Sequence, residues 1–143
     1  AHESYNTSTT DMEGVLALAR KLQIDGVVAY ASDPAAPTAA YVAEHLKLPG
    51  NPFDAVLTLA RKDLFREFLR LNHFNVPRSK SFYDFDSAKE WLLEIGLPAY
   101  IKPVDSSGSK GVTKISNIHE FEKAFDHALF YSREKNPKRF NSC

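Results

Sequence analysis

The chain has 143 residues, of which 43% are hydrophobic and 25% are charged, and its 18 basic side chains balance its 18 acidic ones. This length allows one domain with a sizeable core or two small lobes, and the neutral charge provides no general attraction to nucleic acid or to a membrane surface. The single cysteine, Cys143, excludes an intrachain disulfide and suits a reducing cytoplasm, and no apolar run approaches the roughly 18–20 residues of a membrane span.

The two ends of the chain predict a piece of a longer protein. The chain starts at Ala1 without an initiator methionine and enters an α/β alternation that is already running. At the other end, residues 139–143 stop where a new strand could begin. We therefore expect further sequence on both sides.

The first half of the chain alternates helix and strand signals. Thr10 and Glu13 form a capping box that predicts the start of a helix. Residues 24–31 form a mostly apolar run that predicts a buried parallel strand. Asp33, which is followed by a proline, predicts the N-cap of a second helix, and the turn-rich residues 48–52 mark the end of this part.

Ser32 and Asp33 lie where the expected strand runs into the expected helix. Ligands collect at such junctions in open α/β sheets, because a helix N-terminus offers free N–H groups and a partial positive charge. These two residues are therefore a candidate site for a substrate or an anion. The simpler interpretation is that Asp33 uses its carboxylate to cap its own helix.

The second half of the chain carries further helix and strand signals on both sides of a glycine-rich segment. They predict a helix that is entered through residues 57–63 and ends near Asn72, and then a short strand at 79–83. A second helix is predicted to start at a Ser87–Glu90 capping box and to end at Gly96. A last helix is predicted from residue 116 or 117 to just before Pro137.

Residues 99–115 carry the strongest chemical signal. A short apolar strand at 99–101 leads to Lys102, and a second strand at 112–115 follows a run of serine and glycine. The backbone N–H groups of such a run are accessible and its glycines adopt positive φ, so that the loop is able to fold around an anion. The candidate anion-binding residues of this loop are Ser106, Ser107, Gly108, Ser109, Lys110 and Gly111.

The Ser/Gly loop matches neither of the two common phosphate-binding patterns. The P-loop and the dinucleotide fingerprint both run into a helix, whereas Lys110 and Gly111 run into a strand. The remaining interpretation is a hairpin loop that lies over phosphates, closer in kind to the glycine-rich loop of protein kinases. The alternative is a plain hairpin turn. Two features disfavour it: the loop is longer than a tight hairpin requires, and a lysine such as Lys102 on an apolar strand costs free energy unless it meets an anion or a carboxylate.

Other polar residues give weaker signals. Lys62 lies at the start of a helix, where a positive charge opposes the macrodipole, so a further partner is expected. His119, Glu122 and Asp126 have the helical spacing of a metal site, but they are more simply a solvated helix face. The basic run at 133–139 is interrupted by a glutamate and a proline and predicts a surface connection.

In their order and spacing, these residues resemble the ATP-grasp superfamily, in particular the branch of biotin carboxylase, the carbamoyl-phosphate synthetase large chain and phosphoribosylglycinamide synthetase. The resemblance rests on Lys62 with residues 65–69, on residues 75–77, on 100–103 and on 106–112. Upstream, residues 24–38 resemble the Rossmann-like domain that precedes the ATP-grasp domain.

The resemblance implies an α/β fold in two parts. Residues 1–57 would be an incomplete Rossmann-like pre-ATP-grasp domain that lacks its first strand. Residues 58–143 would be the first part of an ATP-grasp domain and would contain the phosphate-binding loop.

The resemblance also implies an activity. Lys62 and Lys102 would contact the phosphates of ATP, and residues 106–111 would close over them. ATP would phosphorylate a small carboxylate substrate, and an amine would displace phosphate from the acyl phosphate, with Mg²⁺ bridging the ATP phosphates. The family's metal ligands lie beyond this chain, so no metal ligand and no catalytic residue is assigned, and the fragment alone is expected to be inactive.

Two other functions stay open. One is a non-catalytic ATP sensor or structural domain of the same fold. The other is a nucleic-acid module that uses residues 107–114, which the neutral charge disfavours. We expect a cytoplasmic protein whose partners are a nucleotide and a small carboxylate substrate. Nucleic acid and membranes are not expected as partners, and a homo-oligomer is possible.

Overall fold

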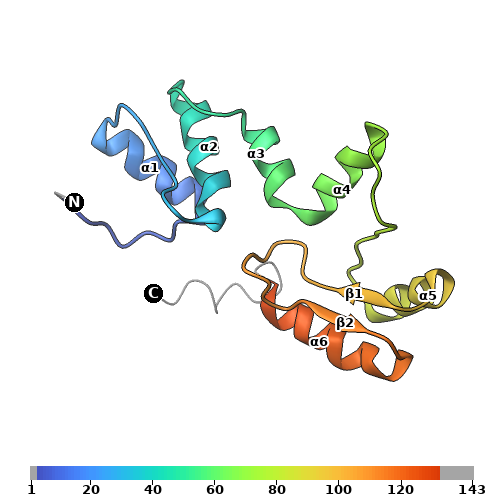
Figure 1. The fold of residues 1–143 in the computed structure, drawn as a ribbon. Coiled ribbons are helices and arrows are strands. Elements are labelled where there is room, and N and C mark those ends of the chain that lie inside the picture. Colours follow the sequence, from blue (N-terminus) through green and yellow to red (C-terminus); the bar gives the residue numbers. More distant parts are fainter. Residues whose placement is uncertain (1–2, 133–143) are drawn as a thin grey trace. The chain divides into compact units, whose positions relative to one another are not determined.

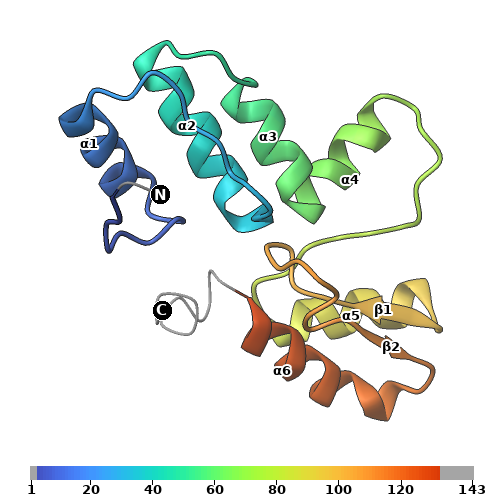
Figure 2. The same ribbon diagram turned by 60° about the vertical axis from the view of Figure 1, so that its left-hand side comes forward.

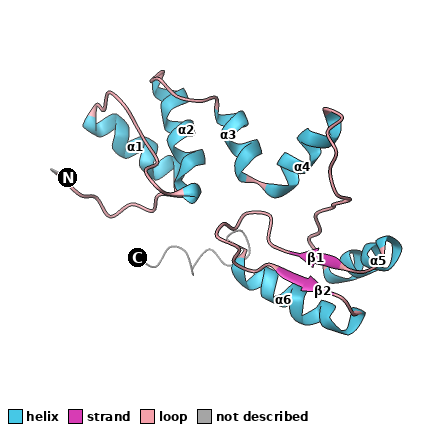
Figure 3. Ribbon diagram, viewed as in Figure 1, coloured by secondary structure: helices cyan, strands magenta, loops and turns pink. Residues whose placement is uncertain are grey.

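The computed structural model describes residues 3–132, and the chain divides into two compact units, Ala1–Ala60 and Arg61–Cys143. Helices dominate the described residues, which also contain one two-stranded antiparallel sheet (Figure 3). No helix within this part of the chain combines the length and the apolar character that a membrane span needs. The basic run at 133–139 and Cys143 lie outside the described residues.

The first unit is built from helices. They are α1 (Met12–Leu22), the 3-10 helix η1 (Asp33–Ala35), α2 (Ala36–Leu46) and α3 (Phe53–Ala60). α1 and α2 lie side by side in both views (Figure 1, Figure 2), and together they bury a small core of Leu16, Ala19 and Val42. The predicted boundary between residues 57 and 58 falls inside α3, and the two-domain division stays a prediction.

The strand expected at residues 24–31 does not form, and that prediction is wrong. Ile24 and Val27 still pack against the core of the first unit. Val28 and Tyr30, in contrast, are 81% and 89% exposed. A strand requires a neighbour that pairs with its N–H and C=O groups, and residues 3–60 contain no second strand to do so. The apolar run therefore packs partly as an irregular segment.

The helix starts of the first unit differ from the predicted ones. Asp11, rather than Thr10, is the N-cap of α1, because its carboxylate accepts a hydrogen bond of 3.0 Å from the N–H of Gly14. Asp33 is not an N-cap either. Ser32 holds that position for η1 without a side-chain cap, and α2 begins only at Ala36.

The second unit combines four helical segments with the sheet. Its elements are α4 (Lys62–Leu71), α5 (Phe85–Ile95), β1 (Ala99–Ile101), β2 (Thr113–Ile115), the 3-10 helix η2 (Ile118–Glu120) and α6 (Phe121–Tyr131). β1 and β2 pair antiparallel, with Ala99 opposite Ile115 and Tyr100 opposite Lys114. The two predicted strands of the loop segment are thus confirmed, with β2 starting one residue late.

The core of the second unit lies on one face of this hairpin. Ala99 and Ile115 are register partners, and both are buried together with Leu92 of α5 and Phe121 of α6. Side chains alternate across a strand, so the partners Tyr100 and Lys114 belong to the opposite face and are exposed. The helices therefore cover one face of the hairpin and leave the other face open.

Two further local predictions fail in the second unit. No strand forms at residues 79–83. Asp84, rather than Ser87, caps α5, and its carboxylate accepts a hydrogen bond of 2.8 Å from the N–H of Ser87. The end of α5 at Gly96, with φ of 78°, agrees with the prediction, as does the start at Asn117, which forms a capping box with Glu120.

Candidate functional site

Lys62 joins the start of α4 to the Ser/Gly loop. Its backbone N–H donates a hydrogen bond of 3.0 Å to the carbonyl oxygen of Val104. Its ammonium group donates a second hydrogen bond to the carbonyl oxygen of Ser106. The fold therefore brings together Lys62 and the first residue of the candidate loop, although 44 positions separate them in sequence.

A second contact holds the same part of the loop to the end of α6. Ser132, which directly follows α6 and is buried, donates its hydroxyl proton to Asp105 over 3.2 Å. Neither residue was among the predicted site residues. Local sequence gives no signal for this pair, because its members lie 27 residues apart.

The tip of the loop is exposed and follows a left-handed path. Gly108, Ser109 and Gly111 have φ of 63°, 57° and 74°. The N–H of Lys110 donates to Ser107 and that of Val112 donates to Ser109, both over 3.4 Å. These residues let the chain turn back toward β2.

Gly111 lies where the loop returns to β2, and here the structure admits only glycine. The residue is buried, and a Cβ atom at this position would lie 2.8 Å from Cβ of Tyr131 and 3.0 Å from Cδ of Pro103. Gly108, at the exposed tip, has open space around the corresponding position. Close packing against α6 therefore confines the exit of the loop, whereas the tip is unconfined.

Ser106 carries a buried hydroxyl group without a hydrogen-bond partner among the described residues. Its side chain belongs to a residue that is only 6% exposed. A buried hydroxyl without a partner costs about 1–3 kcal/mol, and such groups in native structures call for an explanation. A bound anion with oxygen atoms, such as a phosphate, would accept this hydrogen bond.

Lys102 directly follows β1, as predicted, but its side chain is exposed. The expected cost of a lysine on an apolar strand therefore does not arise. Alternation along the extended chain places Lys102 on the same face as Tyr100, which is 64% exposed. Tyr100 was not among the predicted site residues. The period-two alternation of the strand, with Ala99 buried, Tyr100 exposed and Ile101 half-buried, is the feature from which its position beside Lys102 follows.

Arg61 and Asp63 fix the charges at the start of α4. The guanidinium group donates two hydrogen bonds to the carboxylate, of 3.1 and 2.9 Å. Burial raises the pKa of Asp63, but the hydrogen bonds from Arg61 and from the N–H of Leu64 outweigh burial and hold the pKa below its ordinary value. A negative charge in this first helical turn offsets the positive charge of Lys62.

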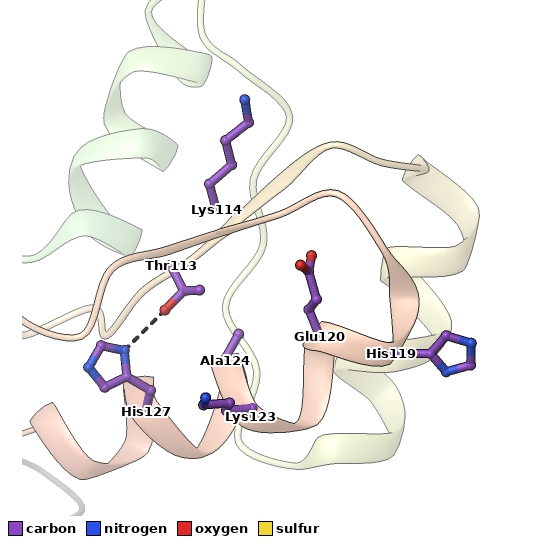
Figure 4. A pocket seen from close by; sticks show the side chains of 7 residues that line it. All are labelled: Thr113, Lys114, His119, Glu120, Lys123, Ala124 and His127. Atoms are coloured by element: carbon purple, nitrogen blue, oxygen red, sulfur yellow. Dashed lines mark hydrogen bonds between the residues drawn. The ribbon is translucent and has the colours of Figure 1, made fainter.

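A shallow hollow between β2 and α6 is lined by several ionisable side chains, but they do not converge. Thr113 and His127 contact each other over 3.0 Å, whereas Lys114 and His119 point away from the hollow in different directions (Figure 4). Among residues 3–132 no group of three or more His, Cys, Asp or Glu side chains is arranged to hold a metal ion. His119, which was predicted on the solvated face of the last helix, lies in η2 and is exposed, as are Glu122 and Asp126 of α6.

Comparison with known proteins places the chain in a family. Phosphoribosylamine–glycine ligase from Pyrococcus furiosus is 32% identical over 134 residues, which cover 87% of this chain and 29% of the relative. The L-amino acid ligase of Bacillus licheniformis matches 80% of this chain and 27% of its own, with 28% identity and a TM-score of 0.61. The chain belongs to the ATP-grasp superfamily.

The ATP-grasp fold is shared with more distant structures. The biotin carboxylase domain of Hydrogenobacter thermophilus 2-oxoglutarate carboxylase, in complex with MgADP, ADP and bicarbonate, has a TM-score of 0.64 at 22% identity, over 85% of this chain and 29% of that one. The resemblance drawn from Lys62, Lys102 and the Ser/Gly loop, and the α/β class, are thereby confirmed. No family model matches the chain.

The chain is much shorter than its ATP-grasp relatives. It spans about 29% of the phosphoribosylamine–glycine ligase and 27% of the L-amino acid ligase. Ser32 and Asp33 lie in the first unit, where Asp33 is exposed at the start of η1. Their role as a substrate or anion site stays a prediction, as do the roles of Lys62, Lys102 and residues 106–111 in binding ATP.

Proposed function

We propose that the second unit binds the phosphates of ATP as part of an ATP-dependent carboxylate–amine ligase that works through an acyl phosphate. The main support is the contact of Lys62 with Ser106, which joins the predicted helix lysine to the predicted phosphate loop. A plain hairpin turn would not need a lysine from a distant helix. The family shared with two amino-acid ligases supports the class of reaction.

Each group of the loop has a task in this proposal. Lys62 and Lys102 offset the negative charge of the phosphates, and the hydroxyl of Ser106 donates to a phosphate oxygen. The N–H groups of Gly108 and Ser109 at the exposed tip face the remaining oxygens, and the closed loop excludes water from the acyl phosphate, which water would otherwise hydrolyse. When bound, ATP supplies the phosphoryl group that activates the carboxylate.

Among residues 3–132 no group of three or more His, Cys, Asp or Glu side chains is arranged for a metal ion. Mg²⁺ is commonly bound by one or two carboxylates together with the phosphates of the nucleotide. The family resemblance implies that these carboxylates lie outside this chain. We propose the same here and derive no step through the metal.

Nucleotide titration of the full natural protein that carries these residues tests the proposal. Lys102→Ala is expected to weaken ATP binding about tenfold or more, because a charge-assisted contact to a phosphate is lost. Lys123→Ala is the matched control, since Lys123 is an exposed lysine on α6 beside the hollow described above. Isothermal titration calorimetry gives both affinities.

The two possible failures differ in their meaning. Equal ATP affinity of wild type and Lys102→Ala would overturn the assignment of this loop. ATP binding by the full protein without any turnover would instead favour the alternative, a non-catalytic ATP sensor or structural domain of the same fold.

A further inference from the structure

The end of α6 contacts the Ser/Gly loop at both of its ends. At the entry, Ser132 donates a hydrogen bond of 3.2 Å to Asp105. At the exit, the backbone of Gly111 packs so closely on Tyr131 that a Cβ atom would come within 2.8 Å. Two successive residues of the chain, Tyr131 and Ser132, thus limit where the loop begins and where it ends.

The entry of the loop is held from a second direction as well. Lys62 donates to the carbonyl oxygens of Val104 and Ser106, which are the two neighbours of Asp105. Residues 104–106 therefore receive hydrogen bonds from the start of α4 and from the end of α6. The tip at residues 108–110, in contrast, is exposed. The loop has a fixed entry and a free tip.

We propose that the Asp105–Ser132 hydrogen bond is a positioning contact for the phosphate loop. It rests on the proposed function, and it adds two residues that neither the family resemblance nor the predicted site contains. Ser132 does not touch the ligand. It holds Asp105, and through the backbone of Asp105 it fixes the orientation of the Ser106 carbonyl and hydroxyl groups.

The expected consequence of losing this contact follows from the neighbouring bonds. Without the Ser132 hydroxyl, Asp105 loses its hydrogen bond to the end of α6, and we expect residues 104–106 to move more. The Ser106 carbonyl then turns away from Lys62 during part of the time. The Lys62 ammonium and the buried Ser106 hydroxyl, which the proposed function assigns to the phosphates, then lose their fixed positions.

The test uses Ser132→Ala, Ser132→Thr and the control Lys123→Ala in the full natural protein. Two readouts are measured: ATP affinity by calorimetry, and the rate of tryptic cleavage after the exposed Lys110, followed by mass spectrometry without nucleotide. For Ser132→Ala we expect affinity to fall about five- to tenfold and cleavage to accelerate. Ser132→Thr, which keeps the hydroxyl, restores both values, and Lys123→Ala changes neither.

A purely structural role for Ser132 would lower the unfolding midpoint without these changes. Wild-type affinity and wild-type cleavage in a folded Ser132→Ala protein overturn the positioning role and leave the ATP proposal intact. If the wild type binds no ATP, the proposed function fails, and the nucleotide-free cleavage rate still decides whether the contact holds the loop. Should Ser132→Ala not fold, Asp105→Ala, which removes the acceptor of the same hydrogen bond, is measured in the same way, with the same expected and contradicting outcomes.

Discussion

Gly111 and Gly108 show how differently two glycines of one loop are constrained. Both have positive φ, of 74° and 63°, and this conformation costs other L-residues about 1–2 kcal/mol. Only Gly111 is also in close contact, with Tyr131 and Pro103. The requirement for glycine at position 111 is thus steric as well as conformational.

At the residue scale we therefore expect different costs for the two alanine substitutions. Gly108→Ala should lower the free energy of unfolding by about 1 kcal/mol, from its φ alone. Gly111→Ala should lower it by about 2–4 kcal/mol, because Tyr131 and Pro103 must also move. Urea unfolding followed by the fluorescence of Trp91, the one tryptophan of the chain, reports on the second unit. Equal costs would contradict the close contact.

Among the elements, α4 carries two ion pairs that differ in burial. The Arg61–Asp63 pair is partly buried, with side chains 27% and 18% exposed, whereas the Glu67–Arg70 pair of the same helix is 52% and 63% exposed. Solvent screens the second pair more strongly. The first pair should therefore contribute more to stability.

Asp63→Asn tests this difference, with Glu67→Gln as its control. The folded state lowers the pKa of Asp63 below its ordinary value of 3.8, so the ionised form is the stabilising one. The contribution, at most about 1 kcal/mol, is present above that value and disappears as the pH falls through the folded pKa. Urea unfolding at pH 7 and pH 3 should show a larger Asp63→Asn difference at pH 7 than at pH 3, and a smaller difference for Glu67→Gln. A loss that is independent of pH would contradict the ionic origin.

Helix starts and strands set the limit of prediction from the sequence. Asp11 caps α1 in place of the predicted Thr10, and Asp84 caps α5 in place of the predicted Ser87. Aspartate is at least as favourable at the N-cap as serine or threonine, and in both cases it lies within three residues of the predicted cap. Local sequence does not rank such neighbours. The prediction of a strand at residues 24–31 is wrong for another reason. A strand forms only where a second strand pairs with it, and the sequence of one segment does not show whether such a partner is present.

The loop was predictable to a different degree. Its flanking strands and its glycines follow from local preferences, and the lysines follow from the family pattern. Its contacts do not. The Lys62–Ser106 and Asp105–Ser132 pairs join residues 44 and 27 positions apart, and only the fold brings them together.

On the scale of the whole molecule, each unit has a core of its own. Leu16 and Val42 belong to the first, and Phe121 and Ile115 belong to the second. The Ser/Gly loop lies within the second unit, as do Lys62 and Ser132, which contact its entry.

Turnover, in contrast, should require more than these 143 residues. The described part of the chain offers no metal-binding cluster, and the chain covers only 29% of its phosphoribosylamine–glycine ligase relative. We expect no magnesium-dependent ATP hydrolysis by the isolated chain in a phosphate-release assay. Robust hydrolysis that Lys102→Ala abolishes would contradict this expectation, and the full natural protein is the positive control.

The Lys62–Ser106 contact has a thermodynamic consequence. The ammonium group has three donors, and the Ser106 carbonyl oxygen uses one of them. In the proposed complex a phosphate would use another donor of the same group, so the carbonyl contact would persist. Part of the rotamer entropy that Lys62 would otherwise lose on binding is then already lost in the free protein. The proposed site would be preorganised at the loop entry, while its exposed tip still has to close.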